Sequence, residues 1–311
     1  MPFKASIHHF EVPLEGAALS TVSGKPTAAD WAIFTTWCAE RSECPLPASA
    51  ELVRRFVAWE ADRGRSPATI ERRVAAIGHY HRAENLVAPT AQPDAGRLRE
   101  TMAGVRNSHG GKKTRKRAAD ANILEAMLGA FPGDGLRALR DRAVLAIGMA
   151  AALRRSELVA LTVSDVELVA EGLRVIIGRS KTDQEQEGAE VAVLEGSRLR
   201  PKAHLLAWMA AAGHNNGLLF RRLTRGDELT PEGMSDRAVA RLVQAAARKV
   251  GLDERQFAGH SLRAGFLTES AARGATIFKM QEVSRHKTVQ ILSEYVRSAE
   301  RFKDHAGRGF L

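Results

Sequence analysis

Several kinds of site are excluded by what this sequence lacks. Its 311 residues include only two cysteines, Cys38 and Cys44, and no histidine accompanies them at metal-binding spacing. Two cysteines cannot form a disulfide framework, and a zinc site is not expected, nor is any other metal or cofactor. Aromatic residues make up only 5% of the chain, so a platform of rings that stacks on single-stranded bases is not expected either.

Long hydrophobic runs are also missing. The longest, Ala143 to Leu153, is too short to cross a bilayer and is followed by Arg154 and Arg155. The first residues lack the basic and then apolar pattern of a signal peptide. We therefore expect a soluble, cytoplasmic protein of a reducing compartment that has no membrane partner.

Positive charge is what the sequence has in excess. It contains 46 Lys and Arg against 36 Asp and Glu, for a net charge of +10 and a pI of about 10.0. This excess favours an anionic polymer as partner, most simply nucleic acid, although ribosomal proteins and many basic enzymes have similar compositions. With few aromatics, a duplex held through its phosphates is the favoured partner.

The sequence pattern in the first third of the chain predicts a small helical bundle. Residues 1–25 show no periodicity and are interpreted as a tail. Apolar residues then recur at helical spacing, with Thr27 and Asp30 as a capping pair and Ser66-Pro67 as the start of a third helix. The expected domain covers residues 26–106, with helices beginning near Thr27, Ser49, Ser66 and Asp94.

Basic residues on this bundle and after it are candidates for binding phosphates. For any single arginine a solvated surface is the simpler interpretation, but together they predict a DNA-contacting face. Residues 107–118 contain two glycines and then five cations within six residues, which indicates either a flexible charged linker or one that follows a duplex. About ten extended residues reach roughly 33 Å, enough to pass a major groove about 12 Å wide. The candidates are Arg54, Arg55, Arg72 and Arg73 in the bundle, and Lys112, Lys113, Arg115, Lys116 and Arg117 in the linker.

The second domain, residues 119–297, is predicted to be mainly helical with a small antiparallel sheet. The polar turn SKTDQEQEG separates two strand-like runs, which should form a hairpin. The fold class is thus mainly α (α+β): a four-helix bundle, and then a mostly helical domain with a three-stranded antiparallel sheet. Strands are expected at Thr162–Leu168, Leu173–Arg179 and Glu190–Leu194, and helices near 120–129, 136–149, 203–212, 235–250, 261–273, 276–285 and 288–297.

Two cations in the second domain stand out. Arg154 follows an apolar helix, where a charge needs an anion to meet, and either Glu157 or a ligand could supply it. Lys181 lies at the tip of the predicted hairpin, where a lysine is ordinarily just solvated but can also be inserted into a groove.

The last part of the chain carries four further candidates. His260 and Arg263 open a helix three residues apart, so they share a face. The helix N-terminus disfavours the imidazolium form of His260, which would leave it neutral near pH 7, although a capping role explains it too. His286 precedes the last helix, and Tyr295 is one of only two tyrosines. Core packing is the simplest reading of a tyrosine there.

As an ordered set, these residues resemble the tyrosine recombinase (phage integrase) family, of the Cre/Xer-like type. The resemblance extends from about Thr27 onward and includes, less specifically, the segment Ser66-Pro67-Ala68-Thr69-Ile70 of the bundle. The matching segments are Leu153-Arg154-Arg155-Ser156-Glu157-Leu158, Ile177-Gly178-Arg179-Ser180-Lys181-Thr182, Gly259-His260-Ser261-Leu262-Arg263, and His286 with Tyr295.

The resemblance implies a site-specific recombinase that needs neither metal nor ATP. Tyr295 would be the nucleophile that joins a DNA 3′ phosphate and frees a 5′ hydroxyl. Arg154 and Arg263, with His286 as a third donor, would hold the scissile phosphate. Lys181 would protonate the leaving oxygen, and His260 would assist proton transfer at Tyr295. Glu157 would be an accessory residue that orients Arg154.

The resemblance also implies how the protein assembles. The bundle would be the core-binding domain, and the partner would be a duplex site with inverted-repeat arms. Four protomers would assemble on two such sites. The tail, residues 298–311, would pack on a neighbouring protomer.

Three features depart from the family pattern. Ala152 stands where glycine commonly precedes Leu-Arg, and Arg285 where glycine usually precedes the late histidine. We expect both to change backbone freedom more than chemistry. Carboxylates that follow Lys181 would repel DNA, so we expect them to face solvent or another protomer; they are Asp183, Glu185 and Glu187.

Two other functions compete with recombination. A type IB topoisomerase would use a similar nucleophile and cations but would relax DNA. A non-catalytic DNA-binding regulator could use residues 276–297 as a helix-turn-helix, but this leaves the ordered Arg, Lys, His and Arg set unexplained.

Overall fold

The computed structural model describes residues 27–109, 116–178, 188–213, 215–301, 303 and 306–307. The chain divides into two compact units, Met1–Thr114 and Arg115–Leu311, and the division falls inside the segment interpreted as a linker. The first unit contains α1 (Ala28–Ala39), α2 (Ala50–Asp62), α3 (Pro67–Ala83), the 3-10 turn η1 (Pro89–Ala91) and α4 (Gly96–His109). Helix α4 runs to His109, so the first three residues of the expected linker are helical.

Local capping signals explain where the helices of the first unit begin. The Thr27 amide donates to the Asp30 carboxylate at 3.1 Å, and the Asp30 amide donates to the Thr27 hydroxyl at 3.2 Å, which completes the predicted capping box. The Ser66 hydroxyl accepts from the Thr69 amide, and Pro67 occupies the first turn of α3.

An aromatic core joins the helices of the first unit. Phe34 and Phe56 are fully buried and meet edge to face with 5.1 Å between ring centroids. Trp31 of α1 stacks on Tyr80 of α3 at 4.5 Å. Such ring pairs add to the burial of their apolar surface, so they fix how α1, α2 and α3 pack.

Two arginines that were expected to contact DNA form ion pairs with buried carboxylates in the first unit. Arg73 is buried and pairs with Glu60, which is only 1% exposed. The prediction that Arg73 lies on an outward surface is therefore wrong, because a buried carboxylate requires a buried partner. Arg72 is half-buried and donates two hydrogen bonds of 2.8 Å to Asp30.

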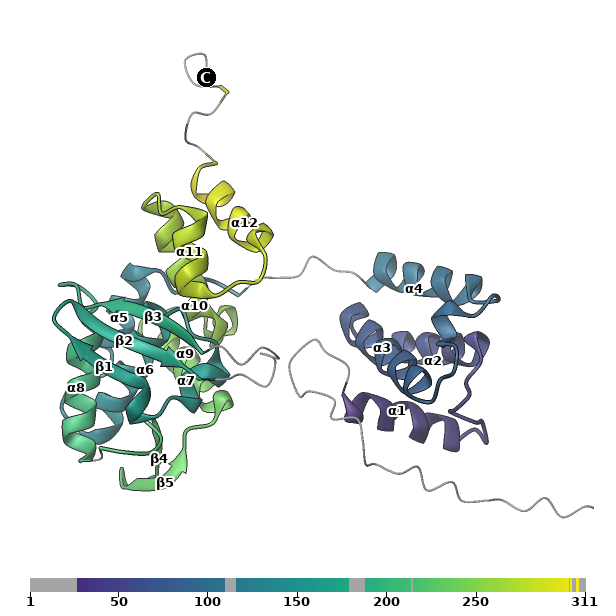
Figure 1. Cartoon of the computed structure of the whole chain (residues 1–311), viewed down its shortest axis with the longest axis horizontal. Coiled ribbons are helices and arrows are strands. Elements are labelled where there is room, and N and C mark those ends of the chain that lie inside the picture. Colours follow the sequence, from purple (N-terminus) through teal and green to yellow (C-terminus); the bar gives the residue numbers. More distant parts are fainter. Residues whose placement is uncertain are drawn as a thin grey trace, which may run out of the picture. The chain divides into compact units, whose positions relative to one another are not determined.

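The second unit combines helices with a small sheet, as the fold class predicted (Figure 1). Strands β1, β2 and β3 form one antiparallel sheet in that order, and β4 and β5 form a short antiparallel pair that the sequence did not reveal. The elements are α5 (Ala121–Gly129), α6 (Leu136–Ala150), α7 (Arg155–Ala160), η2 (Val163–Asp165), β1 (Val166–Val169), β2 (Gly172–Ile177), β3 (Ala189–Leu194), α8 (Pro201–Ala212), β4 (Arg221–Leu223), β5 (Leu229–Gly233), α9 (Asp236–Lys249), η3 (Glu254–Gln256), α10 (His260–Ala272), α11 (Ile277–Ser284) and α12 (Val289–Ala299).

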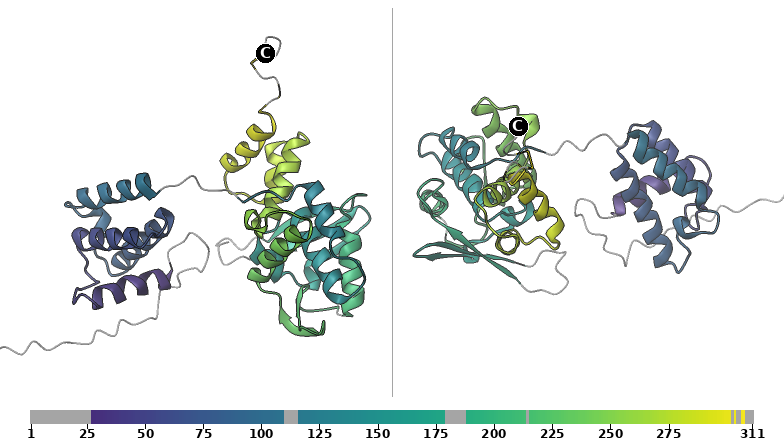
Figure 2. Two further views of the ribbon diagram at one scale, coloured as in Figure 1. Left: turned by 180° about the vertical axis from the view of Figure 1, so that it is seen from behind. Right: turned by 90° about the horizontal axis from the view of Figure 1, so that it is seen from above.

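One face of the three-stranded sheet packs on the helices and the other is open (Figure 2). In β2 the buried residues Leu173, Val175 and Ile177 alternate with the exposed Arg174 and Ile176. This period-two alternation is the pattern that a one-sided antiparallel sheet requires.

Helix α6 is central to the second unit and contacts α5, α7, α8, α9 and α10. Gly148 lets α10 come close, because a Cβ at this position would lie 2.8 Å from a methyl group of Leu262. Gly265 on α10 has the same role against the segment before α5, where a Cβ would lie 1.9 Å from the Ala119 carbonyl oxygen. Within the described part of the chain, no helix has both the length and the apolar character needed to cross a membrane.

Candidate active site

Arg154 is positioned by the sharp turn between α6 and α7. Ala152, in this turn, has a φ of +47°, in the left-handed region where glycine is comfortable. Arg154 then caps α7: its amide donates to the Glu157 carboxylate at 2.7 Å, and its guanidinium pairs with the same carboxylate. The Arg154 side chain remains 48% exposed, whereas the Glu157 side chain is only 6% exposed. Glu157, one of the two anions that the sequence analysis considered for Arg154, is thus its partner, and the guanidinium is held at the surface.

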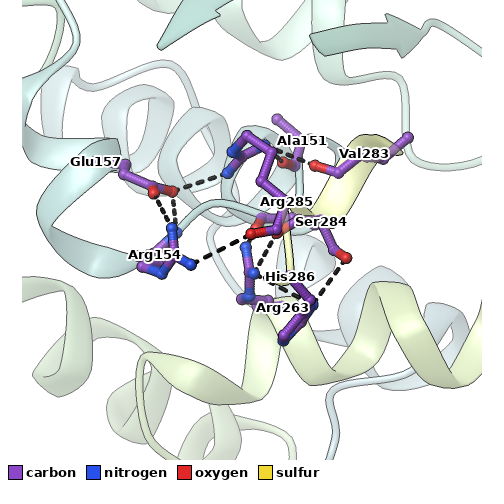
Figure 3. A network of polar contacts seen from close by, with 9 residues as sticks. Ala151, Arg154, Glu157, Arg263, Val283, Ser284, Arg285 and His286 are labelled. Carbon is purple, nitrogen blue, oxygen red and sulfur yellow. Dashed lines mark hydrogen bonds and ion pairs between the residues drawn. The ribbon is translucent and has the colours of Figure 1, made fainter. Parts of the chain in front are cut away.

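Arg263 enters the same region from α10. It is 1% exposed, and its guanidinium donates to the Ala152 carbonyl oxygen. It also donates to the Ser284 carbonyl oxygen (Figure 3). Burial and then the charges of Arg154 and Arg285 lower the pKa of Arg263. A guanidinium nevertheless stays protonated in proteins, so a buried cation joins the α6–α7 turn to the segment between α11 and α12.

His286 follows α11 and contacts Arg263. Its Nδ1 lies 2.8 Å from the Ser284 hydroxyl and 3.3 Å from a guanidinium nitrogen of Arg263. Because an arginine can only donate, Nδ1 must accept, and the ring proton of the neutral form is therefore on Nε2. Burial, followed by the charges of Arg263 and other nearby cations, lowers the pKa of His286 to about 4. His286 is thus a neutral ring with an Nε2–H donor at pH 7.

His260 begins α10 beside these cations. Although the residue is exposed, partial burial of its ring and then the charges of Arg263, Arg155 and Arg154 lower its pKa. The direction agrees with the neutral His260 that was expected from the helix N-terminus. Gly259 packs against the Arg155 side chain so closely that a Cβ would lie 2.1 Å from its Cδ.

Tyr295 lies on α12 and is partly buried against an apolar cluster that includes Leu267, Met280 and Leu292. Tyr295 contributes to the electrostatic surroundings of Arg263, because a negative charge on its oxygen would favour the protonated guanidinium. The packing interpretation and the site interpretation of this tyrosine are therefore compatible, because a ring that packs on the apolar cluster also belongs to the electrostatic surroundings of Arg263.

The sequence analysis missed the part that Arg285 plays. Arg285 ends α11 with a φ of +54°, in the left-handed region that glycine adopts most easily. An effect on the backbone was expected at this position. Its side chain, however, is only 13% exposed, and a guanidinium nitrogen lies 2.8 Å from the Glu157 carboxylate (Figure 3). The side chain therefore makes contacts in addition to the backbone effect that was expected. The signal was present in the sequence, since a charged residue where glycine is usual needs a partner.

Several predicted residues lie outside the described part of the chain. They are Lys181, the carboxylates Asp183, Glu185 and Glu187, and the linker cations Lys112, Lys113 and Arg115. Of the described linker cations, Lys116 donates to the Arg255 carbonyl oxygen and Arg117 lies 5.8 Å from the Phe257 ring, so both contact other residues of the second unit, to which they belong. In the first unit, Arg54 pairs with Glu51 and Arg55 with Glu43, both at the surface.

Comparison with known proteins decides the family. The model of the phage integrase family matches residues 120–301, which is more than half of the chain. The chain belongs to the phage integrase family. As a tyrosine recombinase, it is an enzyme of site-specific DNA recombination that cleaves and rejoins DNA.

Individual tyrosine recombinases agree with this assignment. The chain is 32% identical to an integrase/recombinase xerD homolog of Selenomonas ruminantium, over 91% of this chain and 83% of that protein. It is 30% identical to the tyrosine recombinase XerD of Pseudomonas putida, over 87% of this chain and 85% of that protein. The XerH site-specific recombinase, bound to a palindromic difH substrate after cleavage, shares the fold with a TM-score of 0.64 at 17% identity, over 84% of this chain and 72% of that one. These similarities do not favour the topoisomerase or the regulator alternative.

Proposed function

We propose that this recombinase cleaves DNA through a 3′-phosphotyrosine intermediate formed on Tyr295. The phenol oxygen forms a bond to the scissile phosphorus, and the bond from phosphorus to the 5′ oxygen breaks. The phenolic proton leaves to a base, and an acid protonates the departing 5′ oxygen. Rejoining is the reverse reaction with a 5′ hydroxyl of another strand. Because the phosphotyrosine keeps the energy of the phosphodiester, no nucleotide is consumed.

The observation that carries this proposal is the convergence of donors from distant segments. Arg154 and Arg263 are 109 positions apart in the sequence, yet both bond to the segment Ser284–His286. A phosphorane-like transition state gains charge on its non-bridging oxygens, and guanidinium groups can give those oxygens paired, charge-assisted hydrogen bonds. The Nε2–H of neutral His286 supplies a third donor.

Proton transfer is assigned to two further residues. His260, with its lowered pKa, is unprotonated at neutral pH and accepts the Tyr295 proton. Such help is needed because a phenol has a pKa of about 10. Lys181 protonates the 5′ oxygen, as the family resemblance implies.

DNA recognition is assigned to both units. The helical bundle that was expected over residues 26–106, which extends in α4 to His109, would contact phosphates through surface arginines such as Arg54 and Arg55, and the basic linker after it would follow the duplex. The net charge of +10 supports this. The XerH relative is bound to a palindromic substrate, which supports a target with inverted-repeat arms here. Four protomers would assemble on two such sites, with the tail, residues 298–311, packed on a neighbour.

The test is covalent trapping on a nicked duplex. A target site is first selected from random duplexes by repeated binding. A nick just 3′ of the scissile phosphate then lets the short 5′-hydroxyl fragment diffuse away, so that the protein–DNA adduct accumulates on a denaturing gel. We expect the adduct with the wild type and none with Tyr295→Phe.

Tyr80→Phe is the matched control, because Tyr80 is the only other tyrosine and its ring stacks on Trp31 in the first unit. It should form the adduct at the wild-type rate. An adduct with Tyr295→Phe, or a wild type that binds its site and never forms one, would refute the proposed intermediate.

A further inference from the structure

Arg285 occupies a backbone position that disfavours it. Its φ of +54° is left-handed, a conformation that is less favourable than the right-handed one for a residue with a Cβ. Glycine would avoid this cost at the end of α11. The arginine side chain must therefore make contacts that offset the strain.

Those contacts surround the Arg154–Glu157 pair. One guanidinium nitrogen of Arg285 lies 2.8 Å from Glu157 Oε2, and the other donates to the Val283 carbonyl at 2.6 Å and the Ala151 carbonyl at 3.4 Å. The Arg285 carbonyl oxygen, in turn, accepts from Arg154 at 3.4 Å. Both the side chain and the backbone of Arg285 thus hold the pair, and they do so from the segment that carries His286.

The charges of this cluster explain what the second arginine adds. Glu157 alone would neutralise Arg154, which would weaken its attraction for a phosphate. With Arg285 on the other carboxylate oxygen, the cluster of two cations and one anion keeps a net charge of +1. Burial alone would raise the pKa of Glu157, but the charge of Arg285 and the contacts with Arg154 together lower it, so the carboxylate stays ionised.

We propose that Arg285 is a positioning residue of the recombinase: it holds the Glu157 carboxylate that also binds Arg154, so that Arg154 keeps both its orientation and its charge for the scissile phosphate. This inference rests on the proposed function, in which Arg154 binds that phosphate. A purely structural role for Arg285, which would tie α11 to the α6–α7 turn, is the competing explanation.

The experiment compares Arg285→Gly with Arg200→Gly. Arg200 is also a left-handed arginine, with a φ of +43°, but its side chain is 63% exposed. Both variants relieve the same kind of backbone strain. Single-turnover adduct formation on the nicked duplex is measured over a range of DNA concentrations, and thermal melting reports folding.

Arg285→Gly should lower the cleavage rate at saturating DNA about tenfold or more, because small misplacements of a phosphate-binding group are costly. The DNA concentration for half-saturation should change little, since most phosphate contacts lie elsewhere. Arg200→Gly should cleave like the wild type. Arg285→Lys, which retains a cation beside Glu157 and the strained backbone, should recover part of the rate.

A double-mutant cycle separates positioning from structure. If Arg285 acts through Glu157, then Arg285→Gly should change the rate by less than about twofold once Glu157→Gln is present. The proposal would be overturned if Arg285→Gly cleaved DNA as fast as the wild type. It would also be overturned if Arg285→Gly slowed cleavage by the same factor whether residue 157 was glutamate or glutamine. These rates are compared only if wild type forms the adduct and Tyr295→Phe does not, so a failure of the proposed intermediate would be recognised separately.

Discussion

Replacing Gly265 with alanine should destabilise the second unit, although the same change stabilises most helices. Gly265 faces the chain segment that precedes α5, where a Cβ would lie 1.9 Å from the Ala119 carbonyl oxygen and 2.7 Å from the carbonyl carbon. Both atoms belong to the backbone, so no side-chain rotation can relieve the clash. The segment must move away from α10.

The size of the effect follows from three contributions. Overpacking of a tight contact costs about 1–3 kcal/mol. Moving the segment also strains the hydrogen bonds from the Ala119 amide to the Ser261 carbonyl and from the Ala121 amide to Glu269, each 2.9 Å long and each worth about 1 kcal/mol. The higher helix propensity of alanine returns at most about 1 kcal/mol. The net loss is therefore about 2 kcal/mol, or roughly 4–8 °C in the melting temperature of a unit of this size.

Differential scanning calorimetry of the full chain measures this loss, with Gly129→Ala as the control. Gly129 ends α5, and a Cβ there meets nothing within 4 Å, so this variant should melt at or slightly above the wild-type temperature. Gly265→Ala should also cleave DNA more slowly, because α10 carries His260 and Arg263. If Gly265→Ala melts like Gly129→Ala, then α10 does not approach Ala119 as closely as described, and the reasoning fails.

Two further predictions concern a strained turn and a buried ring. Ala152→Gly should raise the melting temperature of the second unit by a few degrees, because it removes about 1 kcal/mol of left-handed strain; calorimetry that shows a decrease would contradict this. His81 is fully buried, with Nδ1 2.8 Å from the Ile77 carbonyl and Nε2 accepting from the Ala48 amide, and burial lowers its pKa. The unfolded chain therefore binds more protons below about pH 6.5, so the stability of the first unit should fall as the pH drops from 7 to 5. Urea unfolding followed by tryptophan fluorescence checks this, and an equal fall in His81→Leu would show that another group is responsible.

Local signals in the sequence were sufficient for much of the fold. Helix starts were predicted at Thr27 and at Ser66-Pro67 because capping acts within three or four residues. The β2–β3 hairpin followed from a polar turn between two apolar runs. The short strands β4 and β5 were missed because they are polar and irregular, and depend on neighbours rather than on their own pattern.

The candidate site could be predicted only in part from local sequence signals. The order of Arg154, His260, Arg263, His286 and Tyr295 marked it in the sequence, because the residue types suit phosphoryl transfer. The sequence did not show that the first four of these residues lie close together in the fold. The contact between Arg263 and His286, which assigns the ring proton to Nε2, exists only once α10 lies beside the segment after α11.

Arginines show most clearly the difference between what the sequence determines and what the tertiary structure determines. In the sequence, Arg73 and Arg285 are single positive charges, and the sequence alone determined that the protein is basic and has the residue types of a recombinase. Tertiary structure alone decided that Arg73 is buried against Glu60 and that Arg285 shares Glu157 with Arg154. The physical reason is that a long charged side chain goes where a carboxylate can compensate for its desolvation. The position of that carboxylate is set by packing between segments far apart in the chain.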